Sequence, residues 1–507
     1  MTICSDLVPK VKNFTKFGPF KLRMSPFLVL AIILIYFTAL IIISVFTSKG
    51  ATTDTFFTAN RQSPWYLVAF GMIGSSLSGI TFVSVPGSVG KVGFSYFQVV
   101  LGYIIGYTVI MTVLMPLYYR LNLVSIYTYL EQRFDKWSYK TGAFFFLLSR
   151  TVGSSLRLCL SATVLQLFLF DAWNVPFYVT VAITIFLIWI YTFKGGIKTI
   201  VWTDAFQTIF LVSAVIISVY LISDRLGLTL GGMMQTVYDS DYSKIFFFDD
   251  VNSTLFFPKQ FFAGAFIAIA MTGLDQDLMQ KNLTCKNLGE AQKNMFWLTI
   301  SIVIVNLLFL TLGALLYIYS QTKGLALPAY TDELYPRLAL NEFGLLAGVF
   351  FLLGIIASSY ASADSALASL TTSFCIDFLN FKNKTETVKR KQKNIVHFSF
   401  SVLFLIIILI SKELNQRSLI ETVLLVAGYT YGPLLGLFSF GLFTTRQVRD
   451  KIVPIICVIA PLISYWISSH STEWFSGYKI GNEVLILNGA ITFVGLWLIS
   501  QKNQIRV

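Results

Sequence analysis

Long apolar stretches separated by short polar loops occupy most of this 507-residue chain. A membrane-spanning helix needs about 20 mostly apolar residues, because unpaired backbone groups are costly in hydrocarbon. By this criterion the sequence predicts an all-α membrane protein with about 13 transmembrane helices. The predicted spans are 27–46, 65–87, 94–118, 141–170, 175–193, 197–222, 260–281, 296–319, 343–379, 395–410, 419–443, 453–468 and 484–500.

The spans fall into groups along the chain. An N-terminal tail of residues 1–26 precedes a leading helix at 27–47. Residues 65–222 and 260–443 then hold five spans each, and residues 451–500 hold two more. No segment looks like a separate soluble domain, so we expect the whole chain to work within the bilayer.

The composition supports this class and excludes others. Hydrophobic residues make up 55% of the chain and charged residues only 12%, whereas a soluble protein carries about a quarter charged residues. The net charge of +13 does not indicate nucleic-acid binding, because Lys and Arg lie in short loops between apolar runs. Five cysteines lack metal-ligand or disulfide spacing, and two histidines leave little scope for a zinc site or a catalytic triad.

The distribution of basic residues predicts the orientation. The loop after the leading helix, and every second loop from there on, carries the larger share of Lys and Arg. Such loops face the cytoplasm, so we expect the N-terminus outside and the C-terminus inside a bacterial inner membrane. The basic residues of segment 1–23 are the exception. A translation start at Met24 would explain them, and the alternative is a tail that lies outside.

Two spans have clusters of small and polar residues that a simple helix does not need. One reads GMIGSSLSGITFVSVPG (Gly71–Gly87) and the other AMTGLDQDLMQ (Ala270–Gln280). Each opens a group of five spans, and interrupted helices at matching positions indicate a transporter binding site. The serines alone are also explained by close helix packing. Asp275 and Gln276 beside Gly273 are not, because ionisable groups at that depth usually face an aqueous cavity.

Five motifs carry a resemblance to a known family. They are FFTANRQSPWYLVAFGMIGSSLSGITF, YTYLEQRFDKWSYKTGAFFF, GGIKTIVWTDAFQT, MTGLDQDLMQKNLTCKN and ASSYASADSALASLTTSFCIDFL, in this order. Over about residues 56–443 the chain resembles the sodium:solute symporter family, which includes bacterial proline, pantothenate and sialic acid carriers and animal sodium–glucose cotransporters. The resemblance implies a five-plus-five inverted-repeat, LeuT-like core, in agreement with the grouping of the spans.

The resemblance also implies a first sodium site. Its ligands would be the backbone carbonyls of Gly74, Leu77 and Ser358 and the hydroxyl of Ser362. Ser358, Ser362 and Ser365 are spaced i, i+4, i+7, which places them on one helix face. Hard cations prefer oxygen ligands of this kind.

At the first site this chain lacks one expected ligand, because many relatives have a hydroxyl residue at the position of Ala361.

A second sodium site is a further candidate, so we expect one or two sodium ions. Asp204 matches an acid that some relatives use for a second ion, and Asp364 and Ser365 lie on the serine-bearing helix. The alternative for Asp204 is a solvated residue at the cytoplasmic entry of its helix.

Two arginines are candidates for binding the solute. Arg150 and Arg157 are seven residues apart and share a helix face. One could bind a carboxylate bidentately, as an arginine of this helix does in the sialic acid carriers. The alternative is a structural role, in which an arginine caps carbonyls or neutralises Asp275, Asp277 or Asp364.

Other polar residues could complete the solute site. Thr81, Gln98, Asp275 and Gln276 could hydrogen-bond hydroxyl or amide groups. Tyr429 and Tyr431 in GYTYGP could close an outer gate or simply pack.

The sequence thus predicts sodium-driven symport of a small polar organic solute into the cytoplasm by alternating access, with a carboxylate-bearing sugar acid as one candidate. We expect no catalytic residues, no cofactor beyond sodium, no nucleic-acid partner, and function as a monomer in the lipid bilayer. A proton-coupled symporter of the same fold is the main alternative. A passive channel, a nutrient sensor and an intramembrane enzyme are weaker ones, since no Ser–His or HExxH arrangement occurs and the chain ends at Val507 soon after the last span.

Overall fold

The computed structural model describes residues 25–381, 384–414 and 419–501. The basic tail and the possible start at Met24 lie outside the described residues. The described part is mostly helical. Two short strands, β1 (Gln447–Val448) and β2 (Ser500–Gln501), form an antiparallel pair.

The helices follow the predicted spans closely. The long and bent helices up to the polar loop are α1 (Pro26–Thr47), α3 (Trp65–Ser76), α4 (Gly79–Val92), α5 (Tyr96–Val109), α6 (Met115–Arg120), α8 (Lys136–Leu165), α9 (Phe177–Thr192) and α10 (Ile197–Arg225). Those after it are α12 (Phe257–Ala268), α13 (Gln276–Asn282), α14 (Leu288–Thr322), α16 (Leu345–Ser373), α17 (Glu386–Leu414), α18 (Leu419–Phe443), α19 (Val453–Ser469) and α21 (Val484–Leu498). Shorter helices lie between them: α2 (Thr53–Thr58), α7 (Thr128–Arg133), α11 (Leu230–Tyr238), α15 (Leu334–Asn341) and α20 (Ser471–Trp474).

The expected count of 13 transmembrane helices is not confirmed. Within the described residues, nine helices are long and apolar enough to cross a membrane, or up to 11 if each of two bent pairs is one span. The predicted spans at 175–193 and 484–500 correspond to α9 and α21, with 16 and 15 residues. At 1.5 Å per residue these apolar helices are shorter than a hydrocarbon core of about 30 Å.

The two bent pairs lie where the sequence predicted interrupted helices. Between α3 and α4 the chain turns by 60°, because Leu77 leaves helical geometry (φ −95°, ψ 80°) and Ser78 is extended. Between the π-helical turn η6 (Ile269–Gly273) and α13 it turns by 70° at Leu274 and Asp275. The last carbonyls before such a break have no intrahelical partner, so each break presents backbone oxygens.

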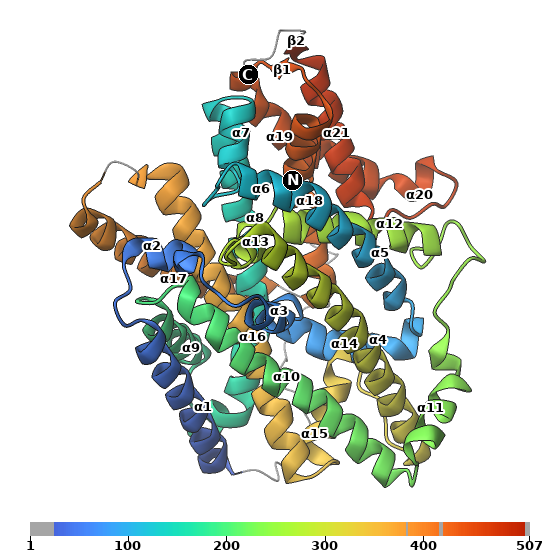
Figure 1. The fold of residues 1–507 in the computed structure, drawn as a ribbon. Coiled ribbons are helices and arrows are strands. Elements are labelled where there is room, and N and C mark those ends of the chain that lie inside the picture. The colour runs from blue at the N-terminus through green and yellow to red at the C-terminus, as the bar shows by residue number, and fades with distance from the viewer. Residues whose placement is uncertain (1–24, 382–383, 415–418, 502–507) are drawn as a thin grey trace, which may run out of the picture.

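The two breaks lie near the middle of the molecule. Helix α10 packs against α3 and α16, and α13 contacts α3, α10 and α16 (Figure 1). Helices α5 and α12 pack closely through Gly102 and Gly264, where any Cβ would overlap the partner's backbone. Small residues allow such contact between membrane helices. The broken segments are therefore held by long helices on several sides.

Candidate functional site

A cavity of about 100 Å³ with a partly polar lining lies beside the first break. Residues of the break line it together with side chains from α5, α8, α12, η6, α14 and α18. Its hydroxyl and cationic lining includes Ser75, Ser76, Ser78, Thr81, Arg150 and Arg157. Three of the residues predicted to bind a solute, Thr81 and the two arginines, therefore share one cavity.

The two arginines have different neighbours. Arg150 is 4% exposed, and its Nη2 atom contacts the carboxylate of Asp277 directly. Its Nη1 atom lies 3.7 Å from Oδ2 of Asp275. The positive charge of Arg150 is thus balanced by two acids at the start of α13. This arrangement corresponds to the structural role that the sequence analysis gave as the alternative to solute binding.

Arg157 has no such counterion. Its Nη1 atom lies 3.4 Å from the hydroxyl oxygen of Ser362 on α16. Among the described residues, no carboxylate lies within ion-pair distance of Arg157. This guanidinium lines the cavity without a partner charge, although a cation at such a depth normally has one.

Gln98 and Tyr429 lie away from the cavity lining. The amide nitrogen of Gln98 donates to the carbonyl of Leu255 (3.0 Å), and its oxygen accepts from the N–H of Phe247 (3.2 Å). Gln98 therefore holds the polar loop before α12. The ring of Tyr429 packs edge-on against Tyr465 of α19.

Gln276 and Asp275 act at the second break. The Gln276 side chain accepts from the N–H of Ile126 (2.9 Å) and donates to the carbonyl of Val124 (2.7 Å). Asp275 accepts a short hydrogen bond from the hydroxyl of Tyr431 on α18. These contacts tie the second broken segment to the chain before α7 and to α18.

The residues predicted for the first sodium site lie on adjoining elements. Gly74 lies in the last turn of α3, and Leu77 follows at the break. Helix α16 packs against both α3 and α4, and it carries the buried serines Ser358 and Ser362. The contact from Arg157 reaches this group through Ser362.

Two hydroxyls at this junction were not predicted as ligands. Gly79, at the start of α4, lies so close to Ser359 of α16 that a Cβ would overlap its hydroxyl oxygen. The hydroxyls of Ser359 and Ser76 are buried without a hydrogen-bond partner in the described structure. The serine clusters of the sequence are the only signal for these two hydroxyls, and they do not indicate which serines lie at the junction.

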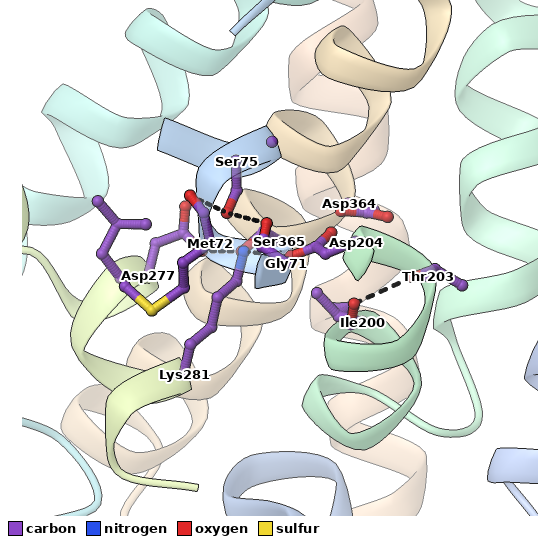
Figure 2. Close-up of polar contacts among 12 residues, drawn as sticks. Gly71, Met72, Ser75, Ile200, Thr203, Asp204, Asp277, Lys281, Asp364 and Ser365 are labelled. Atoms are coloured by element: carbon purple, nitrogen blue, oxygen red, sulfur yellow. Dashed lines mark hydrogen bonds and ion pairs between the residues drawn. The ribbon is translucent and has the colours of Figure 1, made fainter. Parts of the chain in front are cut away.

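The residues predicted for the second cation site also lie together (Figure 2). Asp204 on α10 and Asp364 and Ser365 on α16 are all buried. The Nζ atom of Lys281 lies 2.5 Å from Oδ2 of Asp204. Asp204 is therefore not the solvated helix-entry residue of the alternative interpretation.

Sequence reasoning missed Lys281. It was placed at the end of a predicted span, where a lysine normally reaches the polar interface. A usable signal was its spacing of four residues from Asp277, which puts both on one face of α13. Asp277 itself accepts a short hydrogen bond from Ser365.

A partly polar cavity and a buried ion-pair cluster, where two broken helices meet among long apolar helices, indicate a membrane transporter. The chain belongs to the Sodium:solute symporter family, whose sequence model matches residues 56–450. The resemblance stated from the motifs is thereby confirmed. The chain is a multi-pass membrane transporter of a sodium-coupled family and not an enzyme.

Similar proteins cover most of the chain. The sodium/sialic acid symporter NanT of Aliivibrio fischeri is 24% identical over 476 residues, which are 90% of this chain and 91% of that protein. Sodium-coupled monocarboxylate transporter 1 of Xenopus laevis is 26% identical over 464 residues, covering 87% of this chain and 71% of that protein. The human sodium/iodide cotransporter is 23% identical over 405 residues, which are 77% of this chain and 61% of that protein.

The fold is that of a solved sodium-coupled carrier. A Na⁺-coupled sialic acid symporter, in a substrate-bound outward-open state, matches with a TM-score of 0.80 at 19% identity. The match covers 94% of this chain and 99% of that one. At this identity the likeness establishes the fold alone.

Proposed function

We propose that this carrier couples the inward movement of sodium to the uptake of a small organic solute that bears a carboxylate. Sodium is bound at the first site, by the freed backbone oxygens of Gly74 and Leu77 together with Ser358 and Ser362. The solute lies in the adjacent cavity, and alternating access exposes both to either side of the membrane.

The observation that carries the proposal is the unpaired guanidinium of Arg157. It lines the cavity and has no carboxylate partner among the described residues. An anionic solute would supply the missing charge, and arginine binds a carboxylate through two parallel hydrogen bonds. Arg150 is already paired with Asp277, so we assign the solute to Arg157.

The named substrates of the relatives fit this assignment. Sialic acid, monocarboxylates and iodide appear in the names of similar proteins, and all are anions. They differ greatly in size and shape, so their shared property is negative charge. Thr81, on the same cavity wall, is our candidate for a hydrogen bond to a polar group of the solute.

The same geometry suggests how sodium and the solute are coupled. Arg157 contacts Ser362, so a positive charge lies at the wall of the first sodium site. A solute carboxylate on Arg157 neutralises that charge and makes the site more favourable for sodium. Binding of each partner then favours the other, as linkage requires.

A proton-coupled symporter of the same fold is the second candidate. The observation in its favour is the buried pair of acids, Asp204 and Asp364. A sodium gradient and a pH gradient, applied separately to reconstituted vesicles, distinguish the two drivers.

A thermal-shift screen of the purified protein tests the solute assignment. Sugars, sugar acids, amino acids and vitamins are added with and without sodium. We expect stabilisation by a carboxylate compound that needs sodium, and loss of that stabilisation in Arg157→Gln. Stabilisation by neutral compounds alone, unchanged in Arg157→Gln, would contradict the assignment.

We further propose that the carrier lies in a bacterial inner membrane with its C-terminus in the cytoplasm, and that it functions as a monomer.

A further inference from the structure

A fully buried lysine lies inside the group of residues predicted to form the second cation site. Lys281 is 1% exposed, and its Nζ atom lies 2.5 Å from Oδ2 of Asp204. Figure 2 shows its side chain reaching from α13 towards Asp204, with Asp364 on the far side of that carboxylate. A buried ammonium is very costly unless it is paired, so this contact holds both residues.

The other two predicted ligands of this site each make one hydrogen bond. The hydroxyl of Ser365 donates to Asp277, and Oδ2 of Asp364 accepts from the hydroxyl of Tyr191 at 2.9 Å. A hard cation needs several oxygen ligands directed at one point. In this structure one oxygen of Asp204 is turned to Lys281 and the Ser365 hydroxyl to another acid. Of the three predicted ligands, this leaves Oδ1 of Asp204 and Oδ1 of Asp364 without a hydrogen-bond partner in the described part of the chain. Two oxygens are fewer than a hard cation needs, so the set does not fit a second sodium ion while Lys281 is paired with Asp204.

Charge leads to the same conclusion. Asp364 on α16 lies near Asp204 of α10 (Figure 2), and these two helices pack against each other. Arg150, the cation on the other side of the cluster, forms an ion pair with Asp277 and does not neutralise Asp204 or Asp364. Two neighbouring carboxylates repel and call for a cation, and the ammonium of Lys281 meets that need. A sodium ion beside Asp204 would face this ammonium as a like charge.

We infer that Lys281 is a built-in cation that replaces a second coupling ion, so that the carrier binds one sodium ion, at the first site. The inference rests on the proposed sodium coupling and adds its stoichiometry. In this arrangement Asp204 serves as the counterion of Lys281 and not as a sodium ligand. For a solute with one negative charge, a single sodium makes each transport cycle electroneutral.

The test is the number of ²²Na⁺ ions bound per chain of purified full-length protein. We compare the wild type, Lys281→Met, Lys281→Arg, and the double variant Lys281→Met with Asp204→Asn. We expect one ion in the wild type and in Lys281→Arg, which keeps the charge. Lys281→Met should bind two, because the carboxylates have lost their cation, and the double variant should return to one.

Two ions in the wild type, or no gain in a folded Lys281→Met protein, would overturn the inference. Lys281→Gln serves as a second neutral variant if Lys281→Met is not monodisperse, and the wild-type count decides in either case. Ser362→Ala tests the first site separately, since it should weaken the binding of the one ion of the wild type by about tenfold. A wild type that binds no sodium would contradict the proposed coupling, while a gain of one ion in Lys281→Met would still support the role of Lys281.

Discussion

Nη1 of Arg157 lies 3.4 Å from the hydroxyl oxygen of Ser362. Arg157 lines the cavity beside the first break, and Ser362 belongs to the predicted sodium site on α16. The two proposed binding sites therefore share a contact. Because Ser362 is buried, a charge in one site acts on the other at short range and in a surrounding of low dielectric constant.

Ser362→Ala should raise the sodium concentration that gives half-maximal uptake by about tenfold, corresponding to about 1.4 kcal/mol. The cause is the loss of one oxygen ligand. The matched control is Ser369→Ala on the same helix, because the Ser369 hydroxyl donates only to the carbonyl of Ala366. Sodium dependence that is the same in both variants and the wild type would remove Ser362 from the site.

Arg157→Gln should weaken solute binding by roughly 100-fold, since a buried charge-assisted contact contributes about 3 kcal/mol. In the absence of solute it should strengthen sodium binding, because a positive charge beside Ser362 is lost. The dependence of each affinity on the other ligand should fall accordingly. Isothermal titration measures the affinity for the solute, the affinity for sodium, and the effect of each ligand on the affinity for the other. If that effect is the same in Arg157→Gln as in the wild type, Arg157 does not take part in the coupling.

Arg150→Met should instead destabilise the fold. It leaves Asp277 and Asp275 without their counterion, and breaking a buried ion pair costs about 3–5 kcal/mol. The apparent melting temperature of the purified protein should fall well below that of Arg157→Gln. Equal stability of the two variants would argue against the different roles assigned to these arginines.

Gln276→Leu should cost about 1–3 kcal/mol of stability, because the buried N–H of Ile126 and carbonyl of Val124 lose their partner. Solute affinity should stay near the wild-type value, since Gln276 holds the chain before α7. Melting temperature and equilibrium binding measure the two effects. A large loss of affinity at unchanged stability would return Gln276 to the group of solute ligands.

If the solute is a monoanion, uptake by the wild type should not respond to membrane potential. One sodium ion and one carboxylate carry no net charge, so only the sodium gradient drives accumulation. A tenfold gradient supplies about 1.4 kcal/mol and supports about tenfold accumulation. Potentials set with potassium and valinomycin in vesicles test this, and uptake that rises steeply at negative inside potential would indicate a further ion.

The sequence predicted the helical elements and both breaks because their causes are local. Apolar runs of sufficient length specify the spans, and the small residues around Leu77 and Leu274 weaken the helix where it bends. The count of 13 is not confirmed, because α9 and α21 are apolar but shorter than a full span. The division into two inverted repeats stays a prediction.

The partners within the site could not be predicted in the same way. Arg150 and Arg157 share a helix face and look alike in the sequence, and only their neighbours on other helices distinguish them. Lys281 and Asp204 are 77 residues apart, so their pairing depends on how α13 meets α10. The periodicity of one helix contains no information about such a contact.

Accumulation of a carboxylate solute in proteoliposomes with sodium outside is the decisive measurement of sodium coupling. We expect the solute to be concentrated inside only while the sodium gradient lasts, and to be released by monensin, which dissipates the gradient. Accumulation that persists without sodium and follows an imposed pH gradient, or simple equilibration without accumulation, would contradict sodium-coupled symport.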